Sequence, residues 1–288
     1  MSQSRFKKGQ TNMDAKKESL EAMVMKANAG DRKALETVLV NIQPMIYNLS
    51  LKMLLFPEDA EDASQEILVR LMTRLSTFKG QSQFTTWAYR VATNYLLTAK
   101  GKKSKEFAMD FNSYGRFIDK GQSDSVKVAT NQGELRLLEE EVKVSCTQGL
   151  LLCLSPESRL VYILGDILEF NSNEGGRVMA ISPETFRQQL SRARGKVRNF
   201  LRQKCGLVNK DNPCRCRRKI DFLVNQQLLD PQSPRFAVFE KRSIDLLETI
   251  SGLERETAIY RSNPVMEAPD ALIRNAQALL TQMGQDEE

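Results

Sequence analysis

The sequence predicts an all-α protein, and three observations support this fold class. Apolar residues recur with the helical period of about 3.6 residues through most of the 288-residue chain, and no long alternating strand pattern occurs. Ser-Pro pairs begin at Ser155 and Ser182, where serine can cap a helix and proline can occupy its first position. Turn-rich breakers separate three helical blocks, so we expect two helical domains joined by a linker, followed by a helical extension.

These breaks divide the chain into five segments: a polar N-terminal tail (1–25), a first helical domain (26–108), a linker (109–133), a second helical domain (134–206) and a C-terminal extension (207–288). The extension carries two apolar stripes at helical spacing, from Phe239 to Leu253 and from Leu272 to Met283. Two such helices cannot bury their stripes alone, so they must pack on the domains or on a partner. A regulatory extension and a packing appendage without regulatory role both fit this pattern.

The composition excludes several classes of protein. With 41% hydrophobic and 27% charged residues, the chain is neither a membrane protein nor a disordered one. Histidine is absent, which excludes His-based catalytic triads and HExxH metalloproteases. No apolar run approaches the roughly 18 residues of a membrane span, and the polar N-terminus lacks a signal-peptide core. We therefore expect a cytoplasmic protein without membrane contact, without a cofactor and without enzymatic activity.

The basic residues are concentrated in two places. Residues 187–219 contain twelve Lys or Arg and one acid, a charge of +11 that leaves −5 for the rest of the +6 chain. A second cluster comprises Lys100, Lys102, Lys103 and Lys105. Acidic stretches separate the two basic surfaces, and an acidic cluster comprises Glu58, Asp59, Glu61, Asp62 and Glu66. Two basic surfaces predict a protein that binds a nucleic acid at two sites, whereas a merely solvated charged face is the alternative.

The segment 59–75 predicts an amphipathic helix in the first domain. Its apolar residues lie at positions i, i+1, i+4, i+5 and i+8 from Ile67, which places them on one side. The other side carries Asp62, Gln65, Glu66 and Arg70. An ordinary helix with acids in its first turn would show the same pattern.

A loop and a second helix follow. Gly80 and its polar neighbours predict a loop over residues 79–83, and Thr85 is expected to cap the helix after it. Apolar residues from Phe84 to Tyr95 recur at helical spacing, so Tyr89, Arg90, Thr93 and Asn94 are expected to face outward. An aromatic face and an amide beside cations suit unpaired bases, although a plain core-and-surface helix explains the stripe as well.

The second domain predicts a helix-turn-helix. A turn at 170–174 and a short helix at 174–180 precede a long helix that begins at Pro183. The N-terminal half of that helix presents Arg187, Gln188, Ser191 and Arg192 outward. In a helix-turn-helix this end enters the major groove, where Arg suits guanine edges and Gln suits adenine edges. Arg194, Lys196 and Arg198 lie further along the helix and fit phosphates better.

Four motifs in these segments resemble a known family. The runs D-A-E-D-A-S-Q-E at 59–66 and F-T-T-W-A-Y-R-V-A-T-N at 84–94 resemble conserved region 2 of bacterial sigma factors. The runs S-P-E-S-R at 155–159 and T-F-R-Q-Q-L-S-R-A-R at 185–194 look like region 4. Their order across two domains is similar to the extracytoplasmic-function class of the sigma-70 family, and the resemblance covers about residues 26–205.

The resemblance implies a function and partners. A protein of this family binds core RNA polymerase, recognises the minus-35 and minus-10 promoter elements and promotes promoter melting. Region 2 would dock on the clamp of the largest polymerase subunit through Asp59, Asp62, Gln65 and Glu66, and region 4 would bind the flap. Whether a separate anti-sigma protein also binds is left open by the sequence.

The resemblance also implies two sets of DNA-binding residues. The loop 79–83 would hold a flipped base of the minus-10 element, and the helix after it would hold the opened strand, through Lys79, Gln81, Ser82, Gln83, Trp87, Tyr89, Arg90, Asn94, Lys100, Lys102 and Lys103. The long helix of region 4 would read the minus-35 element through Thr185, Arg187, Gln188, Ser191, Arg192 and Arg194. The sequence departs from the family pattern at two places. Thr98 stands where family members often have Asp, and Gly175-Gly176 predicts that the first helix of the helix-turn-helix is short or poorly ordered.

The five cysteines belong to two groups. Cys146 and Cys153 lie seven residues apart in an apolar stretch, as small core residues would. Cys205, Cys214 and Cys216 lie among Lys and Arg, which should lower their thiol pKa values. Three thiols are weak candidates for a metal site because a fourth ligand is missing, so no metal is expected. A thiol-sensitive switch and a structural turn are the other interpretations.

Two other classes of protein compete with this hypothesis. A helix-turn-helix regulator could bind duplex DNA without being a polymerase subunit, but it would have no need of the Trp- and Tyr-bearing helix in the first domain. An enzyme lacks support, because the sequence shows no phosphate-binding loop and no convincing metal-ligand set.

Overall fold

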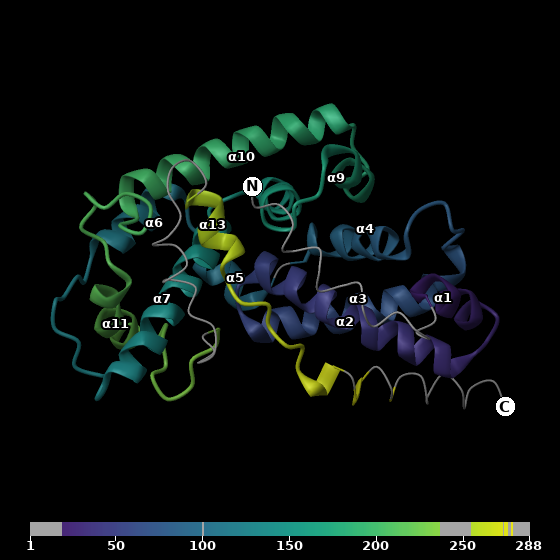
Figure 1. The fold of residues 1–288 in the computed structure, drawn as a ribbon, viewed down its shortest axis with the longest axis horizontal. Helices are drawn as coiled ribbons and strands as arrows, with labels where there is room; N and C mark the ends of the chain where they lie inside the picture. The colour runs from purple at the N-terminus through teal and green to yellow at the C-terminus, as the bar shows by residue number, and fades with distance from the viewer. Residues whose placement is uncertain (1–18, 100, 237–254, 273, 276–277, 279–288) are drawn as a thin grey trace, which may run out of the picture.

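The computed structural model describes residues 19–99, 101–236, 255–272, 274–275 and 278, and in these ranges it forms helices and no strand (Figure 1). This confirms the predicted all-α class. None of the described helices is both long and apolar enough to cross a bilayer. In chain order the elements are α1 (Leu20–Asn28), α2 (Arg32–Leu54), α3 (Pro57–Arg74), η1 (Leu75–Thr77), α4 (Phe84–Leu96), α5 (Lys102–Phe107), α6 (Phe111–Asp119), α7 (Gln132–Leu152), α8 (Pro156–Tyr162), the π-helical turn η2 (Ile163–Ile167), α9 (Ser172–Met179), α10 (Pro183–Lys204), α11 (Cys216–Asn225) and α13 (Arg255–Arg261).

The first helices, α1 to α4, form a bundle in which α2 packs on both α1 and α3. The helix expected from residue 59 is α3, which begins two residues earlier at Pro57. Helix α1 lies partly in the segment expected to be a polar tail, and its Val24 is fully buried. The boundary at residue 25 was therefore misplaced: Leu20, Val24 and Ala27 recur at helical spacing and pack on the core.

The segment expected to be a linker is also ordered. It contains α6, whose Tyr114 and Phe111 rings pack on Phe200 of α10 with centroids 5.7 and 5.8 Å apart. The Tyr114 hydroxyl donates a hydrogen bond to the carbonyl of Cys146 on α7. Aromatic residues that the sequence showed as scattered therefore form one face of a short helix, and this helix packs on the second predicted domain.

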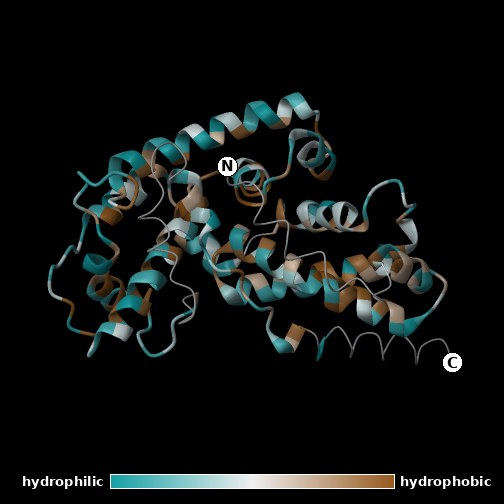
Figure 2. Cartoon of the chain, viewed as in Figure 1, coloured by the Kyte–Doolittle hydropathy of each residue, from teal (hydrophilic) through white to brown (hydrophobic). Residues whose placement is uncertain are grey.

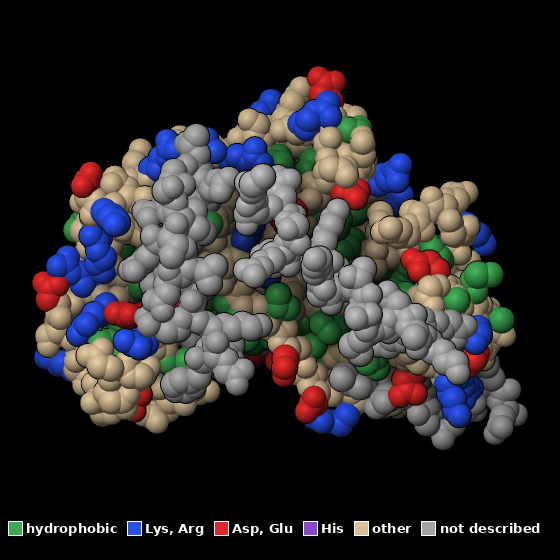
Figure 3. Space-filling model, in the orientation of Figure 1, with side chains coloured by type: hydrophobic (Ala, Val, Ile, Leu, Met, Phe, Trp, Pro, Cys, Tyr) green, Lys and Arg blue, Asp and Glu red, His purple; other side chains and the backbone are tan. Residues whose placement is uncertain are grey.

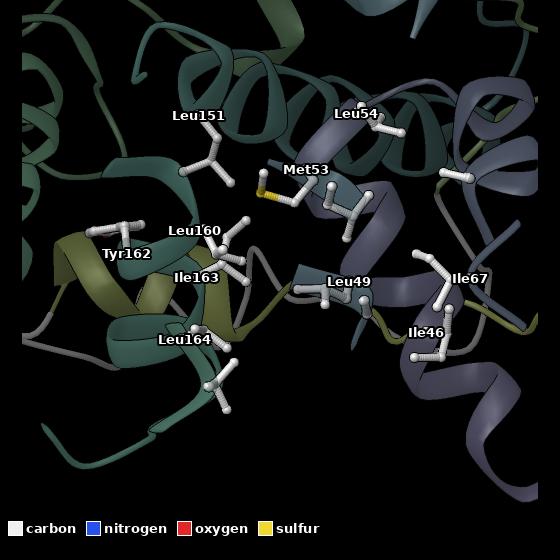
Figure 4. Close-up of a cluster of buried hydrophobic side chains, with 14 of the residues drawn as sticks. Ile46, Leu49, Met53, Leu54, Ile67, Leu151, Leu160, Tyr162, Ile163 and Leu164 are labelled. Carbon is white, nitrogen blue, oxygen red and sulfur yellow. The ribbon is translucent and has the colours of Figure 1, made fainter. Parts of the chain in front are cut away.

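One continuous apolar core extends across both predicted domains. Figure 4 shows Leu49 and Met53 of α2 beside Leu151 of α7 and Leu160 of α8, and all four side chains are at most 1% exposed. Burial of such side chains contributes about 1.5–3 kcal/mol each to the stability of the folded state. The arrangement of the two domains in this structure is therefore fixed by shared apolar packing.

A buried arginine reinforces that junction. The guanidinium of Arg159 on α8 donates hydrogen bonds to the carbonyls of Leu151, Leu152 and Leu154 at the end of α7, at 2.9, 3.2 and 3.0 Å. It also donates to the carbonyl of Met53 near the end of α2 at 2.5 Å. Carbonyls in the last turn of a helix have no partner within the helix, so one side chain satisfies the ends of two helices. Burial lowers the pKa of Arg159 to about 10.

We expect Arg159→Met to destabilise the protein by roughly 2–5 kcal/mol, because it leaves several buried carbonyls without a donor. Urea denaturation followed by circular dichroism measures this loss. Arg136→Met is the matched control, since Arg136 lies exposed on α7. Equal midpoints for the two variants would show that Arg159 does not join the domains.

Two helices of the C-terminal extension, which the sequence analysis did not predict, pack on the second predicted domain. Helix α11 buries Ile220 against Leu135 and Leu138 of α7. Helix α13 places the ring of Tyr260 5.4 Å from that of Tyr162 on α8. The predicted stripe from Phe239 to Leu253 lies outside the described residues, as do the N-terminal residues before 19. Of the second stripe, Leu272 is described and buried.

Candidate nucleic-acid interface

A polar groove of about 450 Å³ brings the predicted minus-10 residues together. The loop 79–83 forms one wall and α4 the other, and Gly80 turns the loop with a positive φ of 70°. The groove is lined by Arg74, Thr77, Phe78, Lys79, Gln81, Ser82, Thr86, Trp87, Arg90, Val91, Asn94 and Arg177. Six of the eleven residues predicted for this element therefore share one surface hollow that contains cations, amides and an aromatic ring.

Trp87 is held in this groove by neighbouring rings. Its centroid lies 5.5 Å from that of Phe84 and 5.8 Å from that of Phe78. Phe84 is fully buried, whereas the indole of Trp87 is half-buried and lines the groove. A rigid ring with one accessible side can stack an unpaired base at low entropic cost.

Two predictions about α4 were wrong. Thr85 does not cap the helix, which begins one residue earlier at Phe84 with Gln83 before it. Tyr89 does not face outward: its ring packs edge-on against Phe170, with centroids 5.1 Å apart, and burial raises its pKa to about 12. Thr93 is fully buried and donates to the carbonyl of Tyr89. The cause is tertiary, because α9 packs on α4.

This packing adds a cation that the sequence analysis missed. Arg177 of α9 lines the same groove as Arg90 and Asn94 of α4. A neighbouring hollow of about 470 Å³ also contains Arg90 and Arg177. Arg177 belongs to the second predicted domain, so no signal along the chain could place it beside the first.

The remaining predicted minus-10 residues lie around this groove or beyond it. Gln83 is exposed at the start of α4. Lys102 and Lys103 are exposed on α5, and Lys103 forms an ion pair of 2.7 Å with Glu58. Lys100 is outside the described residues. Lys102, Lys103 and Lys105 therefore belong to a separate short helix, not to the end of α4.

Helix α10 presents the predicted reading residues outward. Ser182 accepts a hydrogen bond from the backbone of Thr185, and Pro183 occupies the first helical position, as predicted. Arg187, Gln188, Ser191 and Arg192 are all exposed. Figure 3 shows Lys and Arg side chains along the edge that α10 occupies in Figure 1, and Figure 2 shows this helix as hydrophilic over most of its length.

Two predicted minus-35 residues have structural partners instead. Arg194 forms an ion pair with the buried carboxylate of Asp166 in η2, with three hydrogen bonds between them. The hydroxyl of Thr185 lies 2.8 Å from that of Ser182, in the cap of the helix. Arg194 is therefore a poor candidate for a free phosphate contact, because moving it would leave a buried carboxylate unpaired.

The glycine pair in α9 has a packing role. This helix is short, eight residues, as expected, but it is well capped: Asn171 and Glu174 form a capping box. A Cβ at Gly175 would overlap the ring of Phe186 on α10, and a Cβ at Gly176 would stand 2.8 Å from the carbonyl oxygen of Ile181. The two glycines let α9 and α10 cross closely, which offsets their weak helix propensity.

Comparison with known proteins identifies the family. Residues 39–106 match the model of sigma-70 region 2. The chain is 26% identical over 184 residues to the ECF RNA polymerase sigma factor SigW of Bacillus subtilis, covering 62% of this chain and 95% of that protein. It is also 26% identical over 183 residues to the ECF RNA polymerase sigma-E factor of Escherichia coli K12, covering 62% and 92%. The region 2 match and these relatives together support an ECF sigma factor of the sigma-70 family.

A further relative is the RNA polymerase sigma-H factor of Pseudomonas aeruginosa, at 23% identity over 182 residues, 62% of this chain and 92% of that protein.

The predicted polymerase-docking residues of the present chain lie on α3. Asp62 and Glu66 are exposed, and Gln65 is half-buried. Asp59 differs from them, because its carboxylate accepts hydrogen bonds from the backbone and hydroxyl of Ser104 at the start of α5. Asp59 is thus partly used within the fold.

The C-terminal extension of the sigma factor lies against this part of α3. The amide of Asn48 on α2 exchanges two hydrogen bonds with the backbone of Met266, at 2.7 and 2.9 Å. Leu272 is buried with Tyr47 and Ala60, and Asn275 donates to Gln65 at 3.4 Å. Figure 1 shows this yellow segment running from α13 along α2 and α3.

The cysteine segment differs from the prediction. Burial raises the thiol pKa values of Cys205, Cys214 and Cys216, to about 11 for Cys214. The prediction of lowered values was wrong, because desolvation of the thiolate outweighs the nearby cations Arg215 and Lys219. Burial therefore favours the neutral thiol form in this segment.

Proposed function

We propose that this sigma factor binds core RNA polymerase and directs it to promoters that carry a minus-10 and a minus-35 element, promoting their melting. The observation that carries the proposal is the groove between the loop 79–83 and α4. It combines a half-buried Trp87 with Arg90 and Asn94, a set that suits unpaired bases better than duplex DNA. A regulator that reads only duplex DNA has no use for such a groove.

The two elements would be read by different chemistry. In the groove, Trp87 would stack a flipped minus-10 base while Lys79 and Arg90 neutralise the displaced strand. On α10, Arg187 and Gln188 would enter the major groove of the minus-35 element and donate to base edges. Lys196 and Arg192 would hold the adjacent phosphates, a contribution that weakens with salt.

The polymerase contacts would come from both domains. The exposed carboxylates of Asp62 and Glu66, with Gln65, would dock on the clamp of the largest subunit, and region 4 would bind the flap. An exposed acidic side chain on an otherwise buried helix has no role in the core, which favours a role in binding.

The structure corresponds to the closed, unbound protein in this proposal. Two turns of B-DNA span about 70 Å, and the 24 residues of segment 110–133 reach about 80 Å when extended. Here that segment is folded and α9 covers one side of α4. Regions 2 and 4 would therefore have to separate on polymerase, and the C-terminal extension restrains this opening by contacting both.

Promoter melting in vitro tests the proposal. Core polymerase with the full-length chain should render minus-10 thymines reactive to permanganate on a matching promoter. The double variant Arg90→Ala/Asn94→Ala should reduce melting about tenfold or more, equivalent to ~1.4 kcal/mol. Lys33→Ala, an exposed cation on α2 away from the groove, should leave melting unchanged. Duplex binding without polymerase and without melting would contradict the proposal.

We expect Arg187→Ala to weaken promoter binding by about 1–3 kcal/mol and to remove the preference at one minus-35 position. The side chain is exposed near the N-terminus of α10, and its Nη1 donates to Ser172 at 3.1 Å. Binding to a panel of single-substitution promoters measures the effect. Lys196→Ala, exposed on the same helix, should instead weaken all promoters equally and reduce the salt slope by about one. The same uniform loss for Arg187→Ala would make it a phosphate contact.

A further inference from the structure

Four of the five cysteines gather around one cavity. Cys205 ends α10, Cys214 lies in the loop after it, Cys216 begins α11, and Cys146 comes from the middle of α7. All four line the same largely apolar cavity of about 180 Å³. The sequence provides three thiols within twelve residues, and the fold supplies a fourth from a helix some sixty residues earlier. Cys153 is not among the residues that line this cavity.

The segment that carries three of these thiols is tightly folded. Cys205 and Cys214 form the isolated backbone bridge of the described chain, which holds their Cα atoms side by side. The backbone N–H groups of Leu207 and Val208 both point at the sulfur of Cys205 and favour its ionised form. A Cβ at Gly206 would overlap the carbonyl of Cys214, so glycine is required where the two ends of the loop lie against each other.

An arginine holds the rest of the loop in place. Arg215 donates to the carbonyls of Lys210, Asn212 and Cys214, and the amide of Asn212 donates to the carbonyls of Arg202 and Cys205. When side chains of a loop satisfy its own backbone carbonyls in this way, the loop is rigid and holds its other side chains in fixed positions. The thiols are therefore presented from a fixed backbone, not from a loose connection.

A buried cation lies beside the thiols. Lys219 is only 5% exposed, and its ammonium group is close enough to Cys214 and Cys146 to interact electrostatically with both. Its polar partner is the carbonyl of Lys120, and its ammonium stands 5.3 Å from the ring centre of Phe222. Among the described residues, the carboxylate of Asp119 also interacts with it electrostatically, although the two form no ion pair. A buried charge normally has a counter-charge, so this environment fits anionic sulfur ligands.

We propose that Cys146, Cys205, Cys214 and Cys216 together bind one Zn²⁺ ion. Zinc takes four thiolates in its structural sites and accepts just such a set from a short loop and a second element. As the side chains stand, no three Cys, Asp or Glu residues of the described chain could hold an ion. Closing the site therefore requires the thiols, all four of which line this cavity, to turn about their Cα–Cβ bonds.

The charge balance of the site follows from its ligands. Four thiols release four protons when they bind Zn²⁺, and the resulting centre has a net charge of −2. Lys219 and Arg215 lie close enough to the thiols to compensate it. The ion would tie α7 to the junction of α10 and α11, and so would anchor the C-terminal extension to the DNA-reading domain.

Metal analysis of the purified full-length chain tests this site directly. The protein should be produced in zinc-supplemented medium with a tag free of histidine, since the chain itself has none. We expect one zinc ion per chain, lost in Cys146→Ser and in Cys214→Ser. Cys153→Ser is the matched control, because it lies on the same helical stretch but outside the cavity, and it should keep the metal.

Cobalt substitution gives a readout that does not depend on variant folding. Co²⁺ bound by the wild-type chain should show the intense sulfur-to-metal absorption and the visible bands of a tetrahedral four-thiolate site. Added Zn²⁺ should bleach these bands and protect four thiols from maleimide. A wild-type chain without zinc and without cobalt absorption would overturn the proposal. So would a Cys205–Cys214 disulfide in the protein as isolated, or equal zinc loss in Cys153→Ser.

Discussion

The double variant Asp62→Arg/Gln65→Ala is expected to lose association with core polymerase while keeping its fold. Asp62 is exposed on α3 and Gln65 is half-buried, and neither contributes to the apolar core. Reversing a charge at the centre of a docking surface both removes an attraction and creates a repulsion, which costs several kcal/mol. Co-purification with core polymerase and size-exclusion chromatography measure the effect, and circular dichroism measures the fold.

Two controls separate docking from other effects. Glu21→Arg reverses an exposed charge on α1 and should leave association unchanged. Because Gln65 also contacts Asn275 of the extension, the double variant should be repeated in a chain that ends at Ser262. Loss of association in both lengths supports docking through α3. Unchanged co-purification in either length would place the clamp contact elsewhere.

Removing residues 263–288 is expected to raise polymerase association and promoter output by about 5–150-fold, the range of typical coupling energies of 1–3 kcal/mol. In the closed protein the described residues Met266, Leu272 and Asn275 of this segment contact α2 and α3 next to the docking residues. Polymerase and the segment would compete for this side, so a weaker contact favours the open form. Transcription with core polymerase and small-angle scattering on the same chains measure output and opening.

A point variant tests the same contact without shortening the chain. Leu272→Arg places a charge in the cluster of Tyr47 and Ala60 and should reproduce the gain, whereas Asp270→Arg, exposed two residues earlier, should not. If neither truncation nor Leu272→Arg changes output, and scattering still shows the closed shape, the extension has no inhibitory role.

The helices with a strong apolar period could be predicted from the sequence. Helices α3, α4, α8, α9 and α10 begin within a few residues of their expected positions, because caps such as Ser155 and Ser182 act locally. Helix α6 was missed since its rings gain a face only when Phe200 is placed opposite them. Helix α13 was missed because its Tyr260 is buried by residues almost one hundred positions away.

In the candidate site, too, features set by neighbouring residues could be predicted, and features set by distant residues could not. The residues of α4 and the loop 79–83 share a groove because they are neighbours in the chain. Tyr89, Arg194 and Arg177 could not be assigned correctly, since their environments depend on Phe170, Asp166 and α4 respectively. The fourth thiol was missed for the same reason: Cys146 reaches the other three only through the packing of α7.

The core shared by α2, α7 and α8 has a consequence for the kinetics of holoenzyme assembly. Separating the regions breaks the apolar contacts of Met53 with its neighbours across the junction and the hydrogen bond from Arg159 to the carbonyl of Met53. If the regions separate on polymerase as proposed, we expect opening to be slower than diffusional encounter and to precede capture by polymerase. The observed association rate should then stop rising at high polymerase concentration and level off at the rate of opening. In that case the rate of opening within this chain, and not the concentration of polymerase, would limit the speed of holoenzyme assembly.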